Sequence, residues 1–350
     1  MRVLVTGHNG YIGCALVPML IRAGHDVAGL DNCIFEDCTL GPDAEAVPTI
    51  RKDVRDVEQS DVEGFDGIIH LAGISNDPLG DLNPECTYDI NHRASVRLAR
   101  VAKEAGVGRF LFSSSCSNYG AAGGDVLLDE SADFNPVTAY GHSKVLVEQE
   151  VSRLADEDFT PVFLRNATAY GFSARLRGDL VLNNLVGWAH ITGKVRLKSD
   201  GTPWRPIVHI EDISQAFLAL LEAPQDVVHN QAFNVGRTEE NYQMRDLAQI
   251  VMDTVPGSQV TFADGAGPDK RCYRVNCEKI CSTIPFKPRW TARAGARQLY
   301  EAYQAFGLTL ADFEGARYMR IHHVKKLQSE GRLDASLRWI KAAAVAATPA

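Results

Sequence analysis

The sequence predicts an α/β fold, with a Rossmann-like, doubly wound parallel sheet and a smaller mixed α/β lobe. Residues 2–6 form an apolar strand that runs directly into a glycine-rich turn and a helix at residues 14–23. Strand-like and helix-like segments then alternate through the first half of the chain, which is the order that parallel βαβ units require. Small or polar residues follow the end of each strand, where sheets of this kind bind ligands.

Composition and charge narrow the class of protein. Of the 350 residues, 45% are hydrophobic and 23% are charged, which are ordinary globular values. The formal net charge of -8 argues against a nucleic-acid surface and against an anionic membrane. No apolar run approaches the ~18 residues of a membrane span, and the first residues lack the features of a signal peptide. We therefore expect a cytoplasmic protein that binds neither nucleic acid nor membrane.

The eight cysteines are scattered along the chain, and we expect them to be free thiols. Cys272, Cys277 and Cys281 are close in sequence, but their spacing fits no standard zinc pattern and no histidine is nearby. We therefore expect no metal site.

The turn after the first strand carries Gly7, Gly10 and Gly13. Glycine lets the backbone turn tightly and approach a pyrophosphate, whose charge the N-terminus of the next helix stabilises. Because this turn lies between a strand and a helix, we favour dinucleotide binding over a purely structural turn.

A second strand at residues 26–30 ends at Asp31 and Asn32. A carboxylate here can accept hydrogen bonds from the adenosine ribose hydroxyls and would repel a 2′-phosphate, so Asp31 favours NAD over NADP. The alternative is an ordinary turn aspartate, because Asp-Asn is also a good turn sequence. The glycines upstream favour the ribose role.

Three more strands follow in the same pattern. Residues 50–54 form a strand at whose end Asp53 either faces an adenine or is simply exposed. Residues 67–73 close on small side chains that let a cofactor pass over the backbone. After a helix at residues 89–105, the strand at 109–115 runs into a cluster of hydroxyl side chains.

Tyr140 and Lys144 are four residues apart, so a helix places them on the same face, one turn from each other. A neighbouring ammonium lowers the pKa of a phenol, which can then exchange protons with a sugar hydroxyl or carbonyl. Taken alone, this pattern is more often two unrelated residues on a helix surface.

Taken together, these stretches resemble the extended short-chain dehydrogenase/reductase family, and within it the nucleotide-sugar epimerases and dehydratases. The resemblance covers most of residues 1–290 and rests on motifs in the expected order: Gly7 to Gly13, Asp31-Asn32, Leu71 to Gly73, Ser113 to Ser115, and Tyr140 with Lys144.

The resemblance implies a catalytic triad. In it Ser115 hydrogen-bonds the reacting sugar oxygen, Tyr140 is the acid and base, and Lys144 binds the nicotinamide ribose and lowers the tyrosine pKa. It also implies that NAD is bound by Gly7, Asn9, Gly10, Tyr11, Ile12, Gly13, Asp31, Asn32, Asp53, Val54, Leu71, Ala72, Gly73, Ser113, Tyr140 and Lys144.

The substrate residues come from the second half of the chain. The segment from Trp204 resembles the family's Arg-x-x-Val-His-x-x-Asp, in which the arginine contacts the substrate diphosphate, so we assign that role to Arg205. A second phosphate-binding arginine of the family is missing before residue 267, and Arg271 or Arg274 is its substitute. Thr168 stands where many relatives bind the substrate with an asparagine.

We expect the C-terminal residues 316–338 to be a solvated helical extension. The expected division of the chain is a dinucleotide-binding domain at 1–172 and about 206–236, a substrate lobe with the extension at about 173–205 and 237–340, and a disordered tail at 341–350.

The residues after Ser115 separate the family's reactions. Sugar 4,6-dehydratases have Asp-Glu there and decarboxylases have a glutamate at the second position, whereas this chain has Cys116-Ser117. Reductases often use NADPH, which Asp31 disfavours. The sequence therefore favours an NAD-dependent nucleotide-sugar epimerase, most often acting at C4. In such an enzyme Tyr140 takes the hydroxyl proton, and a transient keto sugar rotates before hydride returns to its opposite face.

Three alternatives remain open from the sequence. A C3/C5 epimerase would use Cys116 as its acid and base, although the family cysteine stands one place further on. A sugar dehydrogenase or 4-ketoreductase shares every motif, and a non-catalytic NAD-binding regulator keeps the fold. The family also implies a homodimer, through helices at about residues 91–105 and 140–154.

Overall fold

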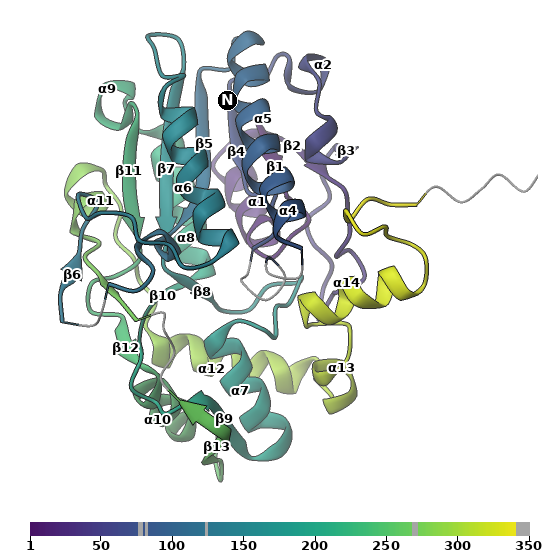
Figure 1. Ribbon diagram of the computed structural model, residues 1–350, viewed down its shortest axis with the longest axis vertical. Helices are drawn as coiled ribbons and strands as arrows, with labels where there is room; N and C mark the ends of the chain where they lie inside the picture. The colour runs from purple at the N-terminus through teal and green to yellow at the C-terminus, as the bar shows by residue number, and fades with distance from the viewer. Residues whose placement is uncertain (76–79, 81–82, 123–124, 268–271, 341–350) are drawn as a thin grey trace, which may run out of the picture.

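The computed structural model describes residues 1–75, 80, 83–122, 125–267 and 272–340, and it contains the expected parallel sheet (Figure 1). The sheet has seven strands in the order β11-β7-β5-β4-β1-β2-β3, and every neighbouring pair is parallel. The order reverses between β1 and β4, which is where a doubly wound sheet binds its ligand. The strands are β1 (Arg2–Thr6), β2 (Asp26–Asp31), β3 (Thr49–Arg51), β4 (Gly67–His70), β5 (Arg109–Ser115), β7 (Thr160–Asn166) and β11 (Gln231–Val235).

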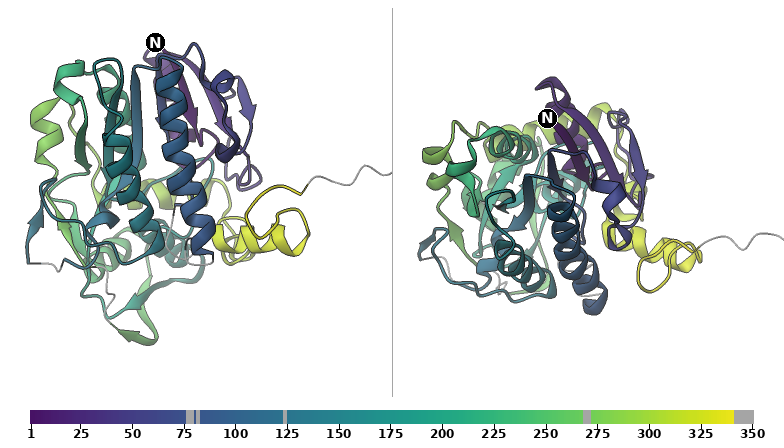
Figure 2. Two further views of the ribbon diagram at one scale, coloured as in Figure 1. Left: turned by 45° about the horizontal axis from the view of Figure 1, so that its top comes forward. Right: turned by 90° about the horizontal axis from the view of Figure 1, so that it is seen from above.

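Helices cover both faces of the sheet. On one face lie α5 (Ala94–Glu104) and α6 (Ala139–Ser152), which pack against each other (Figures 1 and 2). On the other face lie α1 (Gly13–Arg22) and α8 (Ile210–Glu222), which also contact each other. The fold class expected from the sequence is therefore confirmed.

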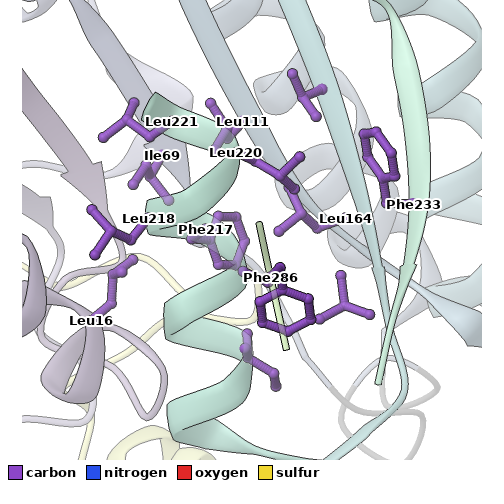
Figure 3. Packing of buried hydrophobic residues seen from close by; sticks show 14 of the residues in the cluster. Leu16, Ile69, Leu111, Leu164, Phe217, Leu218, Leu220, Leu221, Phe233 and Phe286 are labelled. Carbon is purple, nitrogen blue, oxygen red and sulfur yellow. The ribbon is translucent and has the colours of Figure 1, made fainter. Parts of the chain in front are cut away.

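Side chains alternate along the strands, and this alternation divides the core into two layers. In β5, Phe110 and Phe112 face α5 and α6, whereas Leu111 between them faces α1 and α8. Figure 3 shows the second layer, in which Leu218 of α8 lies beside Leu16 of α1. Strand β7 is buried at every residue, as expected for a parallel strand covered on both sides.

A smaller lobe lies beyond the carboxyl ends of the main strands (Figure 1). Its three helices pack around one apolar cluster that includes Leu185, Leu247 and Leu299. Its strands form a three-stranded sheet, β12-β10-β8, and a two-stranded sheet, β13-β9. The elements are β8 (Thr168–Tyr170), α7 (Val181–Thr192), β9 (Lys194–Ser199), β10 (Trp204–His209), β12 (Asn241–Gln243), α10 (Met244–Thr254), β13 (Gln259–Gly267) and α12 (Ala292–Ala305).

Short elements complete the chain. None of the helices in the described residues is both long and apolar enough to cross a membrane. The short elements are α2 (Gln59–Val62), α4 (Pro84–Thr87), α9 (Gln225–Val228), α11 (Glu278–Thr283), α13 (Leu310–Glu314), α14 (Arg320–Ser329), β6 (Leu127–Leu128) and β14 (Arg274–Val275), with single-turn segments at Val54–Asp56, Tyr88–Arg93 and Cys116–Tyr119.

The prediction of a solvated extension at residues 316–338 is wrong. Helix α14 lies beside the carboxyl ends of the sheet (Figure 1), and its Val324 and Leu327 are buried in an apolar cluster with Ile34 and Ile74. Most other residues of α14 are basic or polar, which is why its sequence predicted an exposed helix. The apolar residues that it covers belong to loops far away in the sequence.

Candidate active site

The glycine turn between β1 and α1 has the close packing that a phosphate-binding turn requires. Gly7 has φ +75°, and a Cβ there would lie 2.7 Å from the backbone nitrogen of Ala72. A Cβ on Gly13 would lie 2.2 Å from the carbonyl oxygen of His8. No side chain among the described residues caps the N-terminus of α1, so the positive end of the helix dipole is not covered by a capping side chain.

A pocket lies over this turn and along the strand ends beside it. It brings together most of the residues that the sequence assigned to the cofactor, and the side chains of Arg177 and Arg320 also line it. The predicted residues in its lining are Gly7, Gly10, Tyr11, Ile12, Gly13, Asp31, Asn32, Asp53, Val54, Leu71, Ala72 and Gly73.

Asp31 lines the pocket and also holds the turn. Its Oδ1 accepts from the backbone nitrogen of Cys33 at 2.7 Å, and its Oδ2 accepts from that of Asn9 at 3.1 Å. Burial raises the pKa of this carboxyl group. The two interpretations of Asp31, a turn residue and a ribose-binding residue, are thus compatible. A carboxylate that orders the turn is still able to accept hydrogen bonds from a ribose diol. Asn9 contributes through its backbone and is not part of the lining.

Asp53 also lines the pocket, but its carboxylate already has a partner. It accepts from the guanidinium of Arg55, with Nη2 at 2.7 Å and Nε at 2.9 Å. Burial alone would raise the pKa of Asp53, yet its bonds with Arg55 outweigh this effect and the pKa is lowered. Asp53 therefore gives the pocket a carboxylate that is already paired.

Lys144 has a strongly perturbed pKa near the carboxyl end of β5. Its side chain is buried in α6, and Nζ donates to the carbonyl oxygen of Ser113 at 2.7 Å. Burial lowers its pKa to about 7, against the opposing charge of Glu148. Nζ lies 5.8 Å from the ring centroid of Tyr140, so the predicted placement of the two residues on one helix face is observed.

Ser115 ends β5 and starts the turn that follows. Its Oγ accepts from the backbone nitrogen of Ser117 at 3.1 Å, and only 8% of the residue is exposed. The bond from Lys144 to Ser113 joins α6 to this same strand, two residues before Ser115. The carboxyl end of β5 and the first turns of α6 therefore bring the three predicted triad positions to one end of the sheet. Ser113, Tyr140 and Lys144 lie outside the pocket lining described above.

Sequence reasoning missed the buried ion pair beneath this end of the site. Arg165 of β7 donates to Glu148 of α6, with Nη2 to Oε2 at 2.8 Å, and both side chains are almost fully buried. Ser114 and Asn118 also donate to Glu148. The only local signal was the spacing of Glu148, which is one helical turn beyond Lys144.

Cys116 is a structural thiol. It is fully buried, and its Sγ donates to the carbonyl oxygen of Arg165 at 3.1 Å. Burial raises the pKa of the thiol far above its ordinary value. The thiol is directed into the core and bonded there, so the structure does not support the alternative of a C3/C5 epimerase that uses Cys116 as its acid and base.

The predicted substrate residues occupy two neighbouring strands. Thr168 begins β8 and pairs with Ile207 of β10, the strand that also carries Arg205. Arg205 is 9% exposed, and its Nη1 donates to the carbonyl oxygen of Trp204 at 2.9 Å. Arg271 lies outside the described residues. Both β8 and β10 belong to the separate three-stranded sheet, which joins the main sheet to the smaller lobe.

The chain is similar to known proteins along most of its length. The family described as "NAD dependent epimerase/dehydratase family" matches residues 3–236. A UDP-glucose 4-epimerase of Neisseria meningitidis serogroup C is 28% identical over 261 residues, which cover 67% of this chain and 77% of that one. A UDP-glucose 4-epimerase of Corynebacterium glutamicum is 29% identical over 348 residues, covering 93% of this chain and 99% of that one.

A solved structure shows the same fold. The structure of an NAD-dependent NDP-hexosamine 5,6-dehydratase involved in tunicamycin biosynthesis matches with a TM-score of 0.77 at 23% identity, covering 87% of this chain and 98% of that one. The family match spans well over half of this chain, from the glycine turn to the last strand of the main sheet. The chain therefore belongs to the NAD dependent epimerase/dehydratase family.

Proposed function

We propose that this NAD-dependent enzyme is an epimerase that inverts one carbon of a nucleotide-diphosphate sugar through a transient keto sugar. The observation that carries the proposal is the placement of Lys144. It is buried one helical turn from Tyr140 and bonded to the strand that ends in Ser115, at the same edge of the sheet as the glycine turn. Burying a lysine side chain without a carboxylate partner costs several kcal/mol. A purely structural role for Lys144 does not explain why the fold bears this cost.

NAD, when bound, supplies the acceptor and the donor of hydride. In our proposal Tyr140 takes the proton of the reacting sugar hydroxyl while the carbon is oxidised. It returns the proton after the keto sugar has rotated to present its opposite face. Lys144 favours the anionic form of Tyr140 by its charge. Ser115 donates a hydrogen bond to the sugar oxygen. Arg205 and Thr168 hold the substrate from the neighbouring sheet, together with Arg271.

The names of the relatives guide the choice of sugar and carbon. Both relatives compared above are UDP-glucose 4-epimerases, so we propose C4 of a UDP-hexose as the first reaction to test. The test is incubation of the purified protein with UDP-glucose and NAD, with product analysis by anion-exchange chromatography and absorbance at 340 nm. UDP-galactose without net NADH supports the proposal.

Other outcomes of this experiment contradict the proposal in distinct ways. NADH formed in proportion to product would make the protein a sugar dehydrogenase. A dehydrated keto sugar would make it a dehydratase. No product from UDP-, dTDP- or GDP-linked sugars, alongside tight NAD binding, would favour the non-catalytic regulator.

Replacing Asp31 with Asn should shift the cofactor preference from NAD toward NADP by about tenfold. The amide oxygen keeps an acceptor for one of the two backbone N–H groups that the carboxylate binds, and the change removes the charge that repels a 2′-phosphate. Dissociation constants of both cofactors, measured by calorimetry, check this. Asp26→Asn, at the exposed start of β2, is the matched control. Tighter binding of NADP than NAD by the unmodified protein would refute the ribose role of Asp31.

The burial of Lys144 should make the stability of the cofactor-free protein depend on pH. The folded-state pKa is about 7, whereas an unfolded lysine titrates near ~10.4, so the unfolded chain binds more protons between these values. The free energy of unfolding should therefore rise from pH 7 to pH 9, relative to Lys144→Met, by on the order of 2 kcal/mol. Urea unfolding at both pH values measures this, and a pH-independent difference would contradict it.

We also propose that the protein is a homodimer through the faces of α5 and α6. Two side chains on this face, Arg97 and Gln149, are exposed in the single chain. Sedimentation equilibrium tests the proposal, and a monomer at micromolar concentration would refute it. A charge reversal such as Arg97→Glu should weaken the dimer, and Arg245→Glu on the exposed start of α10 is the control.

A further inference from the structure

The C-terminal residues 318–340, which we call the C-terminal strap, lie against the cofactor pocket. Three of their side chains, Arg320, Val324 and Leu337, are part of its lining. The strap lies outside residues 3–236, which the family matches. The motifs of the family therefore do not account for its position.

The strap is fixed to the loops that surround the adenosine end of the pocket. Nε1 of Trp339 donates to the carbonyl oxygen of Asn32 at 2.6 Å, and Nε2 of His323 donates to that of Ile34 at 2.8 Å. On the other side, Arg55 donates to the carbonyl oxygen of Ser336 at 2.8 Å. The strap thus bridges the segments that follow β2 and β3, where an adenosine is bound in folds of this kind.

Arg320 is the unusual residue of the strap. It is 4% exposed, it forms no ion pair with any described carboxylate, and its Nη1 has no hydrogen-bond partner among the described residues. Its other contacts include Nη2 to the carbonyl oxygen of Arg175 at 3.3 Å, the ring of Phe35 at 4.0 Å and the thiol of Cys38. A buried guanidinium with an unused donor is costly unless an anion joins it.

The glycine turn lies in the same pocket as this charge. Gly7, Gly10, Gly13 and Arg320 all line it. The N-terminus of α1, which no described side chain caps, begins at Gly13 of this lining. A dinucleotide diphosphate is placed over such a turn. Arg320 and the helix therefore offer donors to the same anion.

We propose that the C-terminal strap completes the NAD site, with Arg320 binding the diphosphate and with Val324 and Leu337 covering the adenosine. The strap then slows the release of NAD, because its contacts with Asn32 and Ile34 must open before the adenosine leaves. The inference rests on NAD binding and not on the proposed sugar chemistry, so failure of the epimerase assay leaves it testable.

The first experiment compares Arg320→Met with Lys325→Met, an exposed residue on the same helix. Calorimetric titrations use NAD, ADP, adenosine and UDP. Arg320→Met should weaken NAD and ADP binding about 10- to 100-fold and leave adenosine binding within about twofold, as expected for loss of one charge-assisted contact. Lys325→Met should change none of these constants. Equal weakening of ADP and adenosine, unchanged NAD binding, or weakening confined to UDP would overturn the proposal.

The stability of the cofactor-free variant separates binding from a structural role. Because methionine replaces a buried charge that has no carboxylate partner, the unfolding midpoint of Arg320→Met without NAD should stay the same or rise. A lowered midpoint would assign Arg320 to folding and overturn the binding role. The covering role is tested by Trp339→Ala, which should speed NAD dissociation at least fivefold in stopped-flow displacement. An unchanged rate would overturn it.

Discussion

Replacing Tyr140 with Phe should lower the epimerase turnover number by about 100- to 10,000-fold while NAD binding stays within about twofold. The change removes only the hydroxyl group that accepts and returns the sugar proton, and general acid–base catalysis by one side chain is worth about this much. The ring remains to pack near Lys144, whose Nζ lies 5.8 Å from its centroid. Product formation from UDP-glucose and calorimetric NAD titration measure the two quantities.

The matched control is Tyr300→Phe, a partly buried tyrosine of α12 in the smaller lobe. It should keep turnover within about twofold. Turnover of Tyr140→Phe within tenfold of the unmodified protein would contradict the role of Tyr140. A parallel loss of NAD binding would show instead that the variant disturbs the pocket.

Replacing Glu148 with Leu should destabilise the protein by about 3–5 kcal/mol, because it leaves the guanidinium of Arg165 buried without its carboxylate. Both residues are more than nine-tenths buried, and the pair joins α6 to β7. Loss of the pair should therefore also alter the position of Lys144, one turn earlier on α6. Urea unfolding with tryptophan fluorescence gives the free energy.

The double variant Glu148→Leu with Arg165→Met tests the cause of this loss. Two apolar side chains leave no uncompensated buried charge, so the double variant should recover a substantial part of the stability lost by Glu148→Leu. Losses that simply add would contradict the account. A loss below about 1 kcal/mol for Glu148→Leu alone would show that water or other acceptors satisfy Arg165.

The cofactor half of the site could be predicted from the sequence because its motifs are local. Gly7 to Gly13 and Leu71 to Gly73 each follow directly after a strand, and Asp31 is the last residue of β2. In a parallel sheet the carboxyl ends of neighbouring strands meet at one edge, so the order of elements alone brings these residues together. The same reasoning placed Tyr140 and Lys144 on one helix face.

The rest of the candidate site could not be predicted, because it depends on contacts between segments far apart in the chain. Arg320 lines the same pocket as the glycine turn from about 300 residues away in the sequence, and no periodicity in α14 marks it as a binding residue. The partner of Glu148 lies on a strand, β7, whose register with β5 no local pattern specifies. The role of Cys116 could not be decided from the sequence, because a shift of one position along an extended chain reverses the direction of a side chain. Only the fold shows that its thiol points into the core.

The central claim is that the sugar is inverted by removal and return of hydride at one carbon within the site. The most direct test is conversion of UDP-glucose in deuterium oxide, with the product analysed by proton NMR and mass spectrometry. The account predicts an inverted C4 that carries no deuterium, because only the hydroxyl proton passes through Tyr140. Deuterium on any ring carbon of the product would show that a C–H bond was broken by a base, and would contradict it.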